Sequence, residues 1–202
     1  MHLFPTVIAK AFSKYSGDIK VVEGLGFRHL STDSIQHSGG IVTEIWSTAL
    51  RPYAQKHKSW LILGVAGGSV IKLISRKYHP SRIVGVDIDP VIVDLGKKYF
   101  GLDKIPNLKI IIGNANNLPA DTYDFILVDL FDSTSCPDFV YTSKFLNKTF
   151  KSGQTIFINH LYNSPKSRSS FHKLKDLIIK IKSPPQIRYI LQNAVFIIKN
   201  IY

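Results

Sequence analysis

Short apolar runs alternate with amphipathic segments through most of the chain, and this alternation constrains the fold more than any other feature. The apolar runs are WLILGV (60–65), RIVGVD (82–87), LKIIIG (108–113), YDFILVD (123–129) and QTIFIN (154–159). Helical patterns lie between or after them: SVIKLISRKY (69–78), PVIVDLGKKYF (90–100) and SSFHKLKDLIIKI (169–181). Strands that are apolar on both faces and joined by helices form parallel sheets covered on both sides. The sequence therefore predicts an α/β fold with a doubly wound, mostly parallel sheet.

The two ends of the chain follow other patterns. The runs QIRYIL and AVFIIKN are separated only by Gln192-Asn193, which predicts an antiparallel hairpin at the C-terminal edge of the sheet. Near the N-terminus, DIKVVEG and FRHLSTDS predict a small β-hairpin, and TEIWSTALRPYAQK predicts a helix leading into the main domain. We expect a hairpin cap with its lead-in helix over residues 1–50 and the main domain over 51–202.

Composition limits the class of protein. With 202 residues and 45% hydrophobic content, the chain suits one globular domain with a small appendage. No apolar stretch reaches the roughly 18 residues of a membrane helix, and LFPTVIAKAF lacks the length and flanks of a secretory signal. We therefore expect a cytoplasmic protein without a membrane partner. The single cysteine, Cys136, provides neither an internal disulfide nor a cysteine-based zinc site, and no metal site is expected.

Charge is strong and unevenly distributed. The formal net charge is +12, and from Lys144 onward Asp176 is the only acidic residue. A basic field attracts polyanions, which leaves nucleic acid open as a partner. Lysines that merely solvate outer helix faces would give the same pattern, so the charge does not decide between the two.

A glycine-rich turn carries the first functional signal. Gly64, Gly67 and Gly68 follow the first apolar run and precede a helical pattern, and Asp87 ends the second run ~20 residues later. Glycines let a ligand lie against the backbone, and an acid at this place binds ribose hydroxyls. Tight packing of strand against helix also selects glycine, but the joint occurrence with the acid predicts a nucleoside cofactor. Asp89 before a proline predicts a helix cap.

The motifs resemble those of a known superfamily. LILGVAGGSV, RIVGVDIDPVIVDLGKKYFG, LKIIIGNANNL and YDFILVDLFD, in this order, resemble class I S-adenosylmethionine-dependent methyltransferases. PDFVYTSKFLNKTFKSGQTIFIN and FRHLSTDSIQHS are more narrowly similar to the spermidine synthase-like branch of that superfamily. The resemblance extends over about residues 19–159.

The resemblance implies a set of cofactor contacts for S-adenosylmethionine or its decarboxylated form. Gly64 and Gly68 would approach the methionine portion, and Asp87 would hold the ribose hydroxyls. Gln36 would reach the ribose from the N-terminal cap. A departure from the family concerns Gly67, where aminopropyltransferases carry an aspartate.

The resemblance also implies the adenine contacts and the catalytic groups. Asn114, with Ala115 beside it, would meet the adenine amino edge, although an aspartate is usual at that position. Asp129 stands where the family places its proton acceptor, and Asp132 follows where a second carboxylate often contacts the substrate. A carboxylate suits this role because an amine must lose a proton when it attacks the sulfonium carbon.

The departures from the family bear on the reaction. Without a carboxylate at Gly67, the following helix N-terminus is free to accept the carboxylate of intact S-adenosylmethionine. Val42-Thr43 replaces a Tyr-Gln pair of the aminopropyltransferases, and a positive field slows the approach of a polyamine. These features favour methyl transfer over aminopropyl transfer. His160, alone after the fifth apolar run, is interpreted as structural.

We therefore expect a spermidine synthase-like transferase that moves an alkyl group, methyl rather than aminopropyl, to a small-molecule acceptor such as an amine. Two alternatives stay open at this point. One is a nucleoside-binding subunit without catalysis, and the other is a nucleic-acid methyltransferase that uses the basic C-terminal part. A homodimer is compatible with the sequence, which does not determine the oligomeric state.

Overall fold

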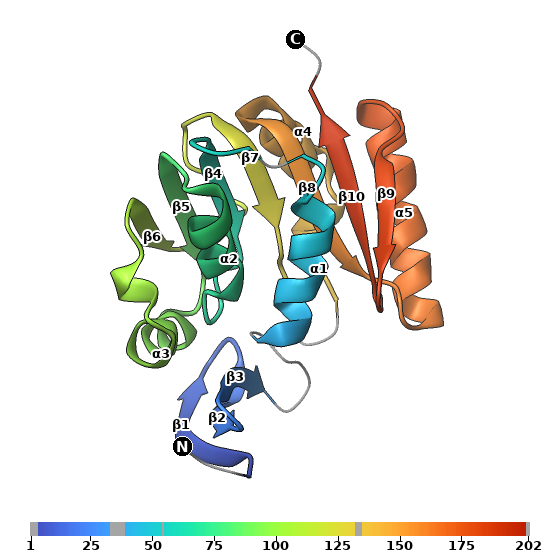
Figure 1. The fold of residues 1–202 in the computed structure, drawn as a ribbon. Helices are drawn as coiled ribbons and strands as arrows, with labels where there is room; N and C mark the ends of the chain where they lie inside the picture. Colours follow the sequence, from blue (N-terminus) through green and yellow to red (C-terminus); the bar gives the residue numbers. More distant parts are fainter. Residues whose placement is uncertain (1–3, 33–38, 54, 132–134, 201–202) are drawn as a thin grey trace.

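The computed structural model describes residues 4–32, 39–53, 55–131 and 135–200, and it contains two β-sheets (Figure 1). The larger sheet has the strand order β6-β5-β4-β7-β8-β10-β9. Its strands are β4 (Ser59–Leu63), β5 (Arg82–Asp87), β6 (Leu108–Ile112), β7 (Tyr123–Val128), β8 (Gly153–Leu161), β9 (Gln186–Ile190) and β10 (Asn193–Lys199).

The first five strands of this order are parallel, and β10 runs antiparallel to both β8 and β9. The predicted doubly wound sheet with an antiparallel C-terminal hairpin is therefore confirmed. The hairpin turn falls one residue earlier than expected, at Leu191 and Gln192, so that Asn193 already belongs to β10.

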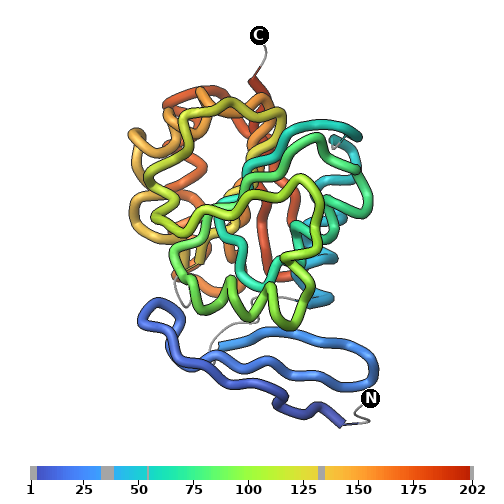
Figure 2. Tube along the Cα trace, turned by 90° about the vertical axis from the view of Figure 1, so that its left-hand side faces the viewer, coloured from blue at the N-terminus to red at the C-terminus, as the bar shows by residue number. Residues whose placement is uncertain are grey.

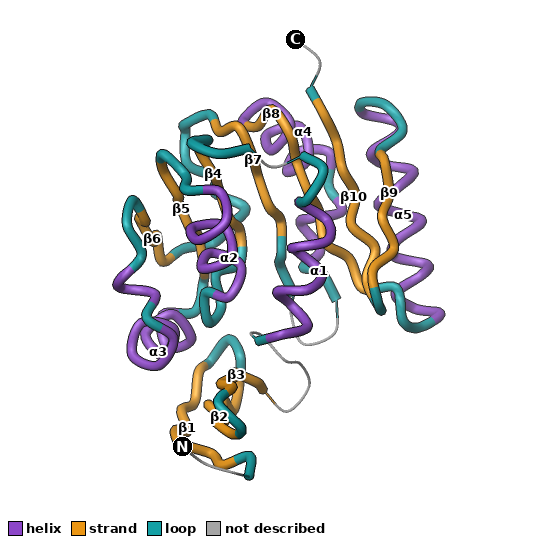
Figure 3. The backbone as a smooth tube through the Cα atoms, viewed as in Figure 1, coloured by secondary structure: helices purple, strands orange, loops and turns teal. Residues whose placement is uncertain are grey.

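Helices cover both faces of the large sheet (Figure 3). They are α1 (Gly40–Leu50), α2 (Ser69–Tyr78), α3 (Pro90–Phe100), α4 (Ser143–Ser152) and α5 (Pro165–Ile181), with short 3-10 turns η1 (Leu102–Lys104) and η2 (Asp138–Tyr141). One buried cluster joins α1, α2 and α3 to one face, and a second cluster joins α4 and α5 to the other. Strand β4 contributes to both, because Trp60 and Ile62 point to the first cluster while Leu61 and Leu63 point to the second.

The N-terminal cap differs from the predicted hairpin. It is a three-stranded antiparallel sheet of β1 (Thr6–Ser13), β2 (Gly17–Gly24) and β3 (Phe27–Thr32). Strand β1 was missed because its apolar side chains do not mark a buried face; Phe12 is 71% and Val7 44% exposed. Figure 2 shows this sheet beside one end of the main domain, and its buried residues Ile19, Val21 and Leu30 join the first core cluster. The division of the chain at residue 50 stays a prediction.

The lead-in helix is shorter than its sequence pattern. Helix α1 ends at Leu50, whereas the pattern extended through Lys56. Pro52 accounts for the early end because it has no backbone N–H with which to continue the helical hydrogen bonds, although Arg51 before it keeps helical backbone angles. Among the described residues, no helix combines the length and the apolar character that crossing a membrane requires.

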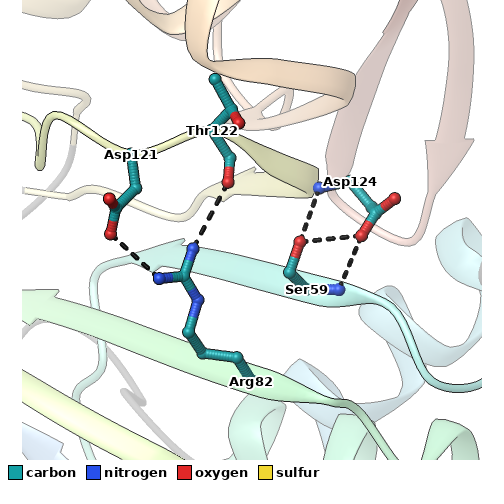
Figure 4. A network of polar contacts seen from close by, with 5 residues as sticks. All are labelled: Ser59, Arg82, Asp121, Thr122 and Asp124. Atoms are coloured by element: carbon teal, nitrogen blue, oxygen red, sulfur yellow. Dashed lines mark hydrogen bonds and ion pairs between the residues drawn. The ribbon is translucent and has the colours of Figure 1, made fainter.

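A polar network holds the amino ends of β4, β5 and β7 together (Figure 4). The Asp124 carboxylate accepts hydrogen bonds from the backbone N–H and the hydroxyl of Ser59, at 2.8 and 2.7 Å. Arg82 donates to Asp121 and to the carbonyl of Thr122. This network lies at the edge of the sheet opposite to the strand ends that carry Asp87 and Asp129, so it fixes strand register away from the site.

We expect Asp124→Ala to lower the free energy of unfolding by about 1–3 kcal/mol at pH 7, because the Ser59 groups lose their acceptor. Burial alone would raise the pKa of Asp124, but the bonds from Ser59 and the Lys58 ion pair outweigh it, so the pKa is lowered. The stabilisation is therefore present above the unfolded pKa of about 3.9 and declines as pH falls through the lower folded pKa.

Urea denaturation at pH 7 and near pH 3 measures this effect. Asp121→Ala is the matched control, since its exposed ion pair with Arg82 should contribute less than about 0.5 kcal/mol. Equal losses in the two variants would contradict the structural role assigned to Asp124.

Candidate functional site

A cavity of about 810 Å³ opens at the carboxyl ends of β4, β5, β7 and β8. Open parallel sheets bind their ligands at this edge, where the loops after neighbouring strands diverge. The cavity is also lined by the turn between β1 and β2, by one side of α1 and by the first turn of α5. Residues of the N-terminal cap and of the main domain therefore line the same cavity.

The glycine-rich turn serves two different purposes. Gly64 lines the cavity with a φ of 93°, and a Cβ at this position would overlap the backbone oxygen of Asp129. Gly67 and Gly68 are buried and do not line the cavity. Gly68 has a φ of 82°, and a Cβ there would meet the side chain of Leu102. Gly64 therefore lets β4 and β7 approach each other beside the cavity, whereas Gly68 lets the start of α2 pack against η1.

Asp87 holds the glycine-rich turn through its carboxylate. Its Oδ2 accepts the backbone N–H groups of Val65 and Ala66, both at 2.8 Å, and its Oδ1 accepts the N–H of Asp89 at 2.9 Å. A carboxylate offers about four acceptor positions, so about one is left for a ribose hydroxyl. Burial raises the pKa of Asp87, and the three backbone hydrogen bonds oppose this rise. The residue fits a nucleoside, but it also shapes the loop that would receive one.

Asp89 caps α3, as the sequence predicts. Its Oδ1 accepts the backbone N–H groups of Val91 and Ile92, at 2.9 and 3.3 Å. Its Oδ2 accepts the hydroxyl of Ser16 at 2.6 Å, and Ser16 belongs to the turn between β1 and β2. The same carboxylate therefore ties the N-terminal sheet to the start of α3, beside the cavity.

The expected adenine contacts lie after β6. Asn114 and Ala115 both line the cavity, and the Asn114 side-chain oxygen accepts the backbone N–H of Asn116 at 2.8 Å. One acceptor position of that oxygen is thus used by the turn, and a second is left for an adenine amine. Gln36 and Asp132, the other two predicted site residues, lie outside the described residues.

Asp129 lines the cavity and lies directly after β7. Its Oδ2 accepts the indole N–H of Trp46 at 2.8 Å, and its Oδ1 accepts the amide N–H of Asn159 at 2.9 Å. Asn159 in turn accepts a hydrogen bond from the amide of Asn193 at 2.9 Å. Both partners of the carboxylate are neutral donors, so they orient it without the strong pKa depression that a cation would cause.

Burial raises the pKa of Asp129, and the bonds from Asn159 and Trp46 only partly oppose that rise. The carboxyl group therefore binds a proton more readily than an ordinary aspartate does, which suits a proton acceptor. Trp46, Asn159 and Asn193 were not predicted from the sequence. A signal existed for Asn159, which ends an apolar run as Asp87 and Asp129 do.

The indole of Trp46 should report the ionisation of Asp129. The chain has two tryptophans, and the indole N–H of Trp60 is buried without a hydrogen-bond partner among the described residues. We expect the Trp46 indole resonance to titrate with a midpoint above the usual aspartate pKa of about 3.9, while that of Trp60 stays constant. Two-dimensional ¹H–¹⁵N NMR measures both signals, and Trp60→Phe assigns them. A midpoint at or below the usual value would contradict the raised pKa of Asp129.

His160 lies on the far side of Asp129 from the glycine-rich turn. Its Nδ1 lies 2.6 Å from the carbonyl oxygen of Leu161, and its Nε2 lies 2.8 Å from the hydroxyl of Tyr141. Since a carbonyl oxygen only accepts, Nδ1 carries the proton and Nε2 accepts from Tyr141. Burial lowers the pKa of His160, which favours this neutral form. In the part of the chain that the structure describes, no three metal-ligating side chains form a cluster.

Comparisons with solved structures show the fold. A spermidine synthase in complex with the transition state analogue AdoDATO matches with a TM-score of 0.72 at 17% identity, over 95% of this chain and 72% of that chain. A probable spermidine synthase from Corynebacterium glutamicum matches with a TM-score of 0.73 at 15% identity, over 96% and 80%. At these identities the likeness concerns the fold alone.

Comparisons with curated proteins and families concern the sequence. A polyamine aminopropyltransferase of Vibrio vulnificus is 34% identical over 95 residues, which cover 44% of this chain and 32% of that protein. A ribosomal protein L11 methyltransferase of Clostridium perfringens is 26% identical over 106 residues, or 52% and 34%. The chain thus spans about a third of the length of these relatives. The family described as "Spermine/spermidine synthase domain" matches residues 19–159, and the chain belongs to this family.

Proposed function

We propose that this protein transfers an aminopropyl group from decarboxylated S-adenosylmethionine to a small-molecule amine. The observation that carries the proposal is the position of Asp129, a carboxylate with a raised pKa that lines a large cavity and is held by two neutral donors. The sequence features favoured methyl transfer, but family membership and the aminopropyltransferase relative favour aminopropyl transfer.

We assign one end of the cavity to the nucleoside of the donor and the other end, beyond Asp129, to the amine. The nucleoside end would consist of Gly64, Asp87, Asn114 and Ala115, together with the turn that Asp89 holds in place. This assignment is supported by the unused acceptor position of Asp87 and by the close approach of backbone that Gly64 permits. Gly67, which does not line the cavity, would act through the packing of α2 rather than by contact with the donor.

Asp129 would take the proton of the reacting amine. A bound sulfonium nucleoside supplies a carbon that a nucleophile can attack and a good leaving group. An amine attacks only as the free base, so a nearby carboxylate of raised pKa assists the step by removing its proton. Trp46 and Asn159 would keep the carboxylate oriented toward the amine, because each of its oxygens is held by one of them.

Methyl transfer from intact S-adenosylmethionine is the second candidate. Two observations favour it: no carboxylate stands at Gly67, and a ribosomal protein L11 methyltransferase is among the relatives. The chemistry at Asp129 would be the same, since a nucleophile still loses a proton. The two candidates differ in which group leaves the sulfur.

A donor comparison tests the proposal. The protein is mixed with a panel of small amines and with either donor, and the nucleoside product is identified by chromatography. We expect methylthioadenosine from the decarboxylated donor at a rate at least tenfold above that of S-adenosylhomocysteine formation from the intact donor. The reverse preference would establish methyl transfer instead. Nucleoside binding in calorimetry without turnover of either donor would support a binding subunit and contradict both reactions.

A further inference from the structure

Three side chains from neighbouring strands of the large sheet form a chain of hydrogen bonds that ends at Asp129. Asp129 follows β7, Asn159 lies near the end of β8, and Asn193 begins β10 (Figure 1). Val195 pairs with Asn159 across β10 and β8, so Asn193, two residues before Val195, lies diagonally from Asn159 on the same face. The side chain of Asn193 bonds to that of Asn159, and that of Asn159 bonds to Asp129.

The Asn159 side chain donates one of these hydrogen bonds and accepts the other. Its Nδ2 donates to Oδ1 of Asp129, and its Oδ1 accepts from Nδ2 of Asn193, both at 2.9 Å. An ionised carboxylate only accepts hydrogen bonds, so the amide must turn its nitrogen toward Asp129. Its oxygen then faces Asn193, which has to supply a donor. An amide turned by 180° would break both bonds and place its oxygen against the carboxylate.

The two asparagines are buried polar residues. Asn159 is 4% and Asn193 8% exposed. In such surroundings hydrogen bonds are stronger than in water, and a polar group that loses its partner is costly. The Asn159 amide therefore keeps a single orientation as long as both of its partners are present.

The other groups around Asp129 do not duplicate this bond. Trp46 donates to the other carboxylate oxygen, Oδ2, and burial is the largest influence on the pKa of Asp129. Glu44, the titratable residue of α1, is exposed. The described titratable residues that line the cavity together with Asp129 are Tyr15, Asp87, Asp89, Cys136, Tyr141, His160 and Lys166.

We propose that Asn193 is a positioning residue, which holds the Asn159 amide in the orientation that directs its N–H group at Asp129. This inference deepens the proposed function and rests on it where transfer is concerned, because an ionised Asp129 is the group that would accept the proton of the amine. Asn193 acts on the carboxylate through Asn159. Its effect is to favour the ionised form of Asp129 and to fix the direction of Oδ1.

Two substitutions at position 193 separate removal of the donor from its reversal. Asn193→Leu removes the donor at similar size, and the strand partners Leu161 and Ile190 give a leucine apolar neighbours. Asn193→Asp places an acceptor where the donor was. The Asn159 amide is then expected to turn its nitrogen toward position 193 and its oxygen toward Asp129. Asp132, which lies outside the described residues, is the same in both variants and in the wild-type protein.

The indole N–H resonance of Trp46 measures the ionisation of Asp129 in the protein without any ligand. Loss of a donor to the ionised form raises the pKa of a carboxyl group, and a bond to a charged group is worth about one to two pKa units. We expect the titration midpoint to rise by about half a pH unit in Asn193→Leu and by at least about one unit in Asn193→Asp. The Trp60 resonance reports whether each variant is folded.

Gln192→Glu is the matched control for the charge that Asn193→Asp introduces. Gln192 is exposed and lines the same cavity, and a glutamate there keeps the acceptor for Asn163. Its charge is screened by solvent, so the midpoint should rise by less than about 0.3 units. A shift as large as that of Asn193→Asp would overturn the proposal. A wild-type midpoint in Asn193→Leu would do the same, and this variant decides alone if Asn193→Asp does not fold.

Transfer kinetics provide the second readout. Both variants at position 193 should lower kcat for methylthioadenosine release by about tenfold, with a change in the KM of the donor of less than about threefold, because the base rather than the nucleoside contacts is disturbed. Shifted midpoints in a protein that turns over neither donor would contradict the proposed function alone. Turnover by the wild-type protein with unshifted midpoints in the variants would contradict only the role of Asn193.

Discussion

Asp129→Asn is expected to reduce aminopropyl transfer by a factor of about 10²–10⁴, the usual contribution of a positioned general base. Asparagine has the shape of aspartate but takes up no proton at neutral pH. Nucleoside binding should change less than about threefold. The substitution leaves intact Asp87 and the backbone N–H groups of Val65 and Ala66 that it binds. Methylthioadenosine release under saturating donor measures the first effect, and calorimetry with methylthioadenosine measures the second.

The pH profile separates a base from a merely structural aspartate. Transfer by the wild-type protein should rise with pH as Asp129 loses its proton, and because burial raises the pKa of this carboxyl, the rise should lie above the usual aspartate pKa of about 3.9. The variant should lack this limb of the profile. A folded variant that keeps more than a tenth of the wild-type rate, with the same limb, would contradict the role of Asp129 as base.

Trp46→Phe offers a comparison within the same network. It keeps an aromatic ring against the core and removes the indole donor to Oδ2 of Asp129. Loss of a hydrogen bond to the ionised form raises the pKa of a carboxyl group, so the rising limb should move to higher pH while the plateau rate falls less than in Asp129→Asn. The two variants therefore distinguish the loss of the base from the loss of its orientation.

The sheet and its hairpin could be predicted because their signals are local. Each central strand is a short apolar run with side chains buried on both faces, as Trp60 and Leu61 illustrate, and this pattern alone indicates a covered parallel sheet. Asp89 before Pro90 indicated a helix start that the structure confirms. The N-terminal strand β1 was missed because its exposed face carries Phe12 and Val7, so its pattern lacks a polar and an apolar side.

The surroundings of Asp129 could not be predicted because they depend on strand order. Trp46, Asn159 and Asn193 come from α1, β8 and β10, up to 147 positions apart in the sequence. Trp46 and Asn159 donate to this carboxylate and Asn193 donates to Asn159, and the two asparagines come together because β7, β8 and β10 lie side by side. The chain order does not specify that β10 inserts between β8 and β9. Asn159 at the end of a strand indicates a functional site, but that it binds Asp129 follows only from the strand order.

The roles of the three glycines in the glycine-rich turn could not be predicted from the sequence either, although these residues are close together in the chain. From the sequence alone, Gly64, Gly67 and Gly68 are equally good candidates for ligand contacts, because each lacks a side chain. Their difference arises from what faces each Cα: the cavity and Asp129 for Gly64, and Leu102 for Gly68. Which neighbour a glycine accommodates is a tertiary property.

Gly64→Ala is expected to lower the free energy of unfolding by about 2–5 kcal/mol, a large part of the 5–15 kcal/mol typical of a domain. Two costs add. The residue has a φ of 93°, where an alanine is strained by about 1–2 kcal/mol. Its Cβ would also overlap the carbonyl oxygen of Asp129, which is backbone and has no rotamer to change, so β4 and β7 must separate at this edge at a further cost of about 1–3 kcal/mol.

Gly101→Ala is the matched control for Gly64→Ala, because it separates the two costs. Gly101 has a φ of 66°, but a Cβ there would meet no heavy atom within 4 Å, so its substitution should cost only the strain of about 1–2 kcal/mol. Urea denaturation of both variants gives the difference directly. In the Gly64 variant the displaced Asp129 should also lose its bond from Trp46, which moves the indole resonance, whereas Gly101→Ala should leave that resonance in place. Equal destabilisation by the two substitutions would mean that β4 and β7 adapt freely at this edge, and the close approach at Gly64 would then not be what positions the carboxylate.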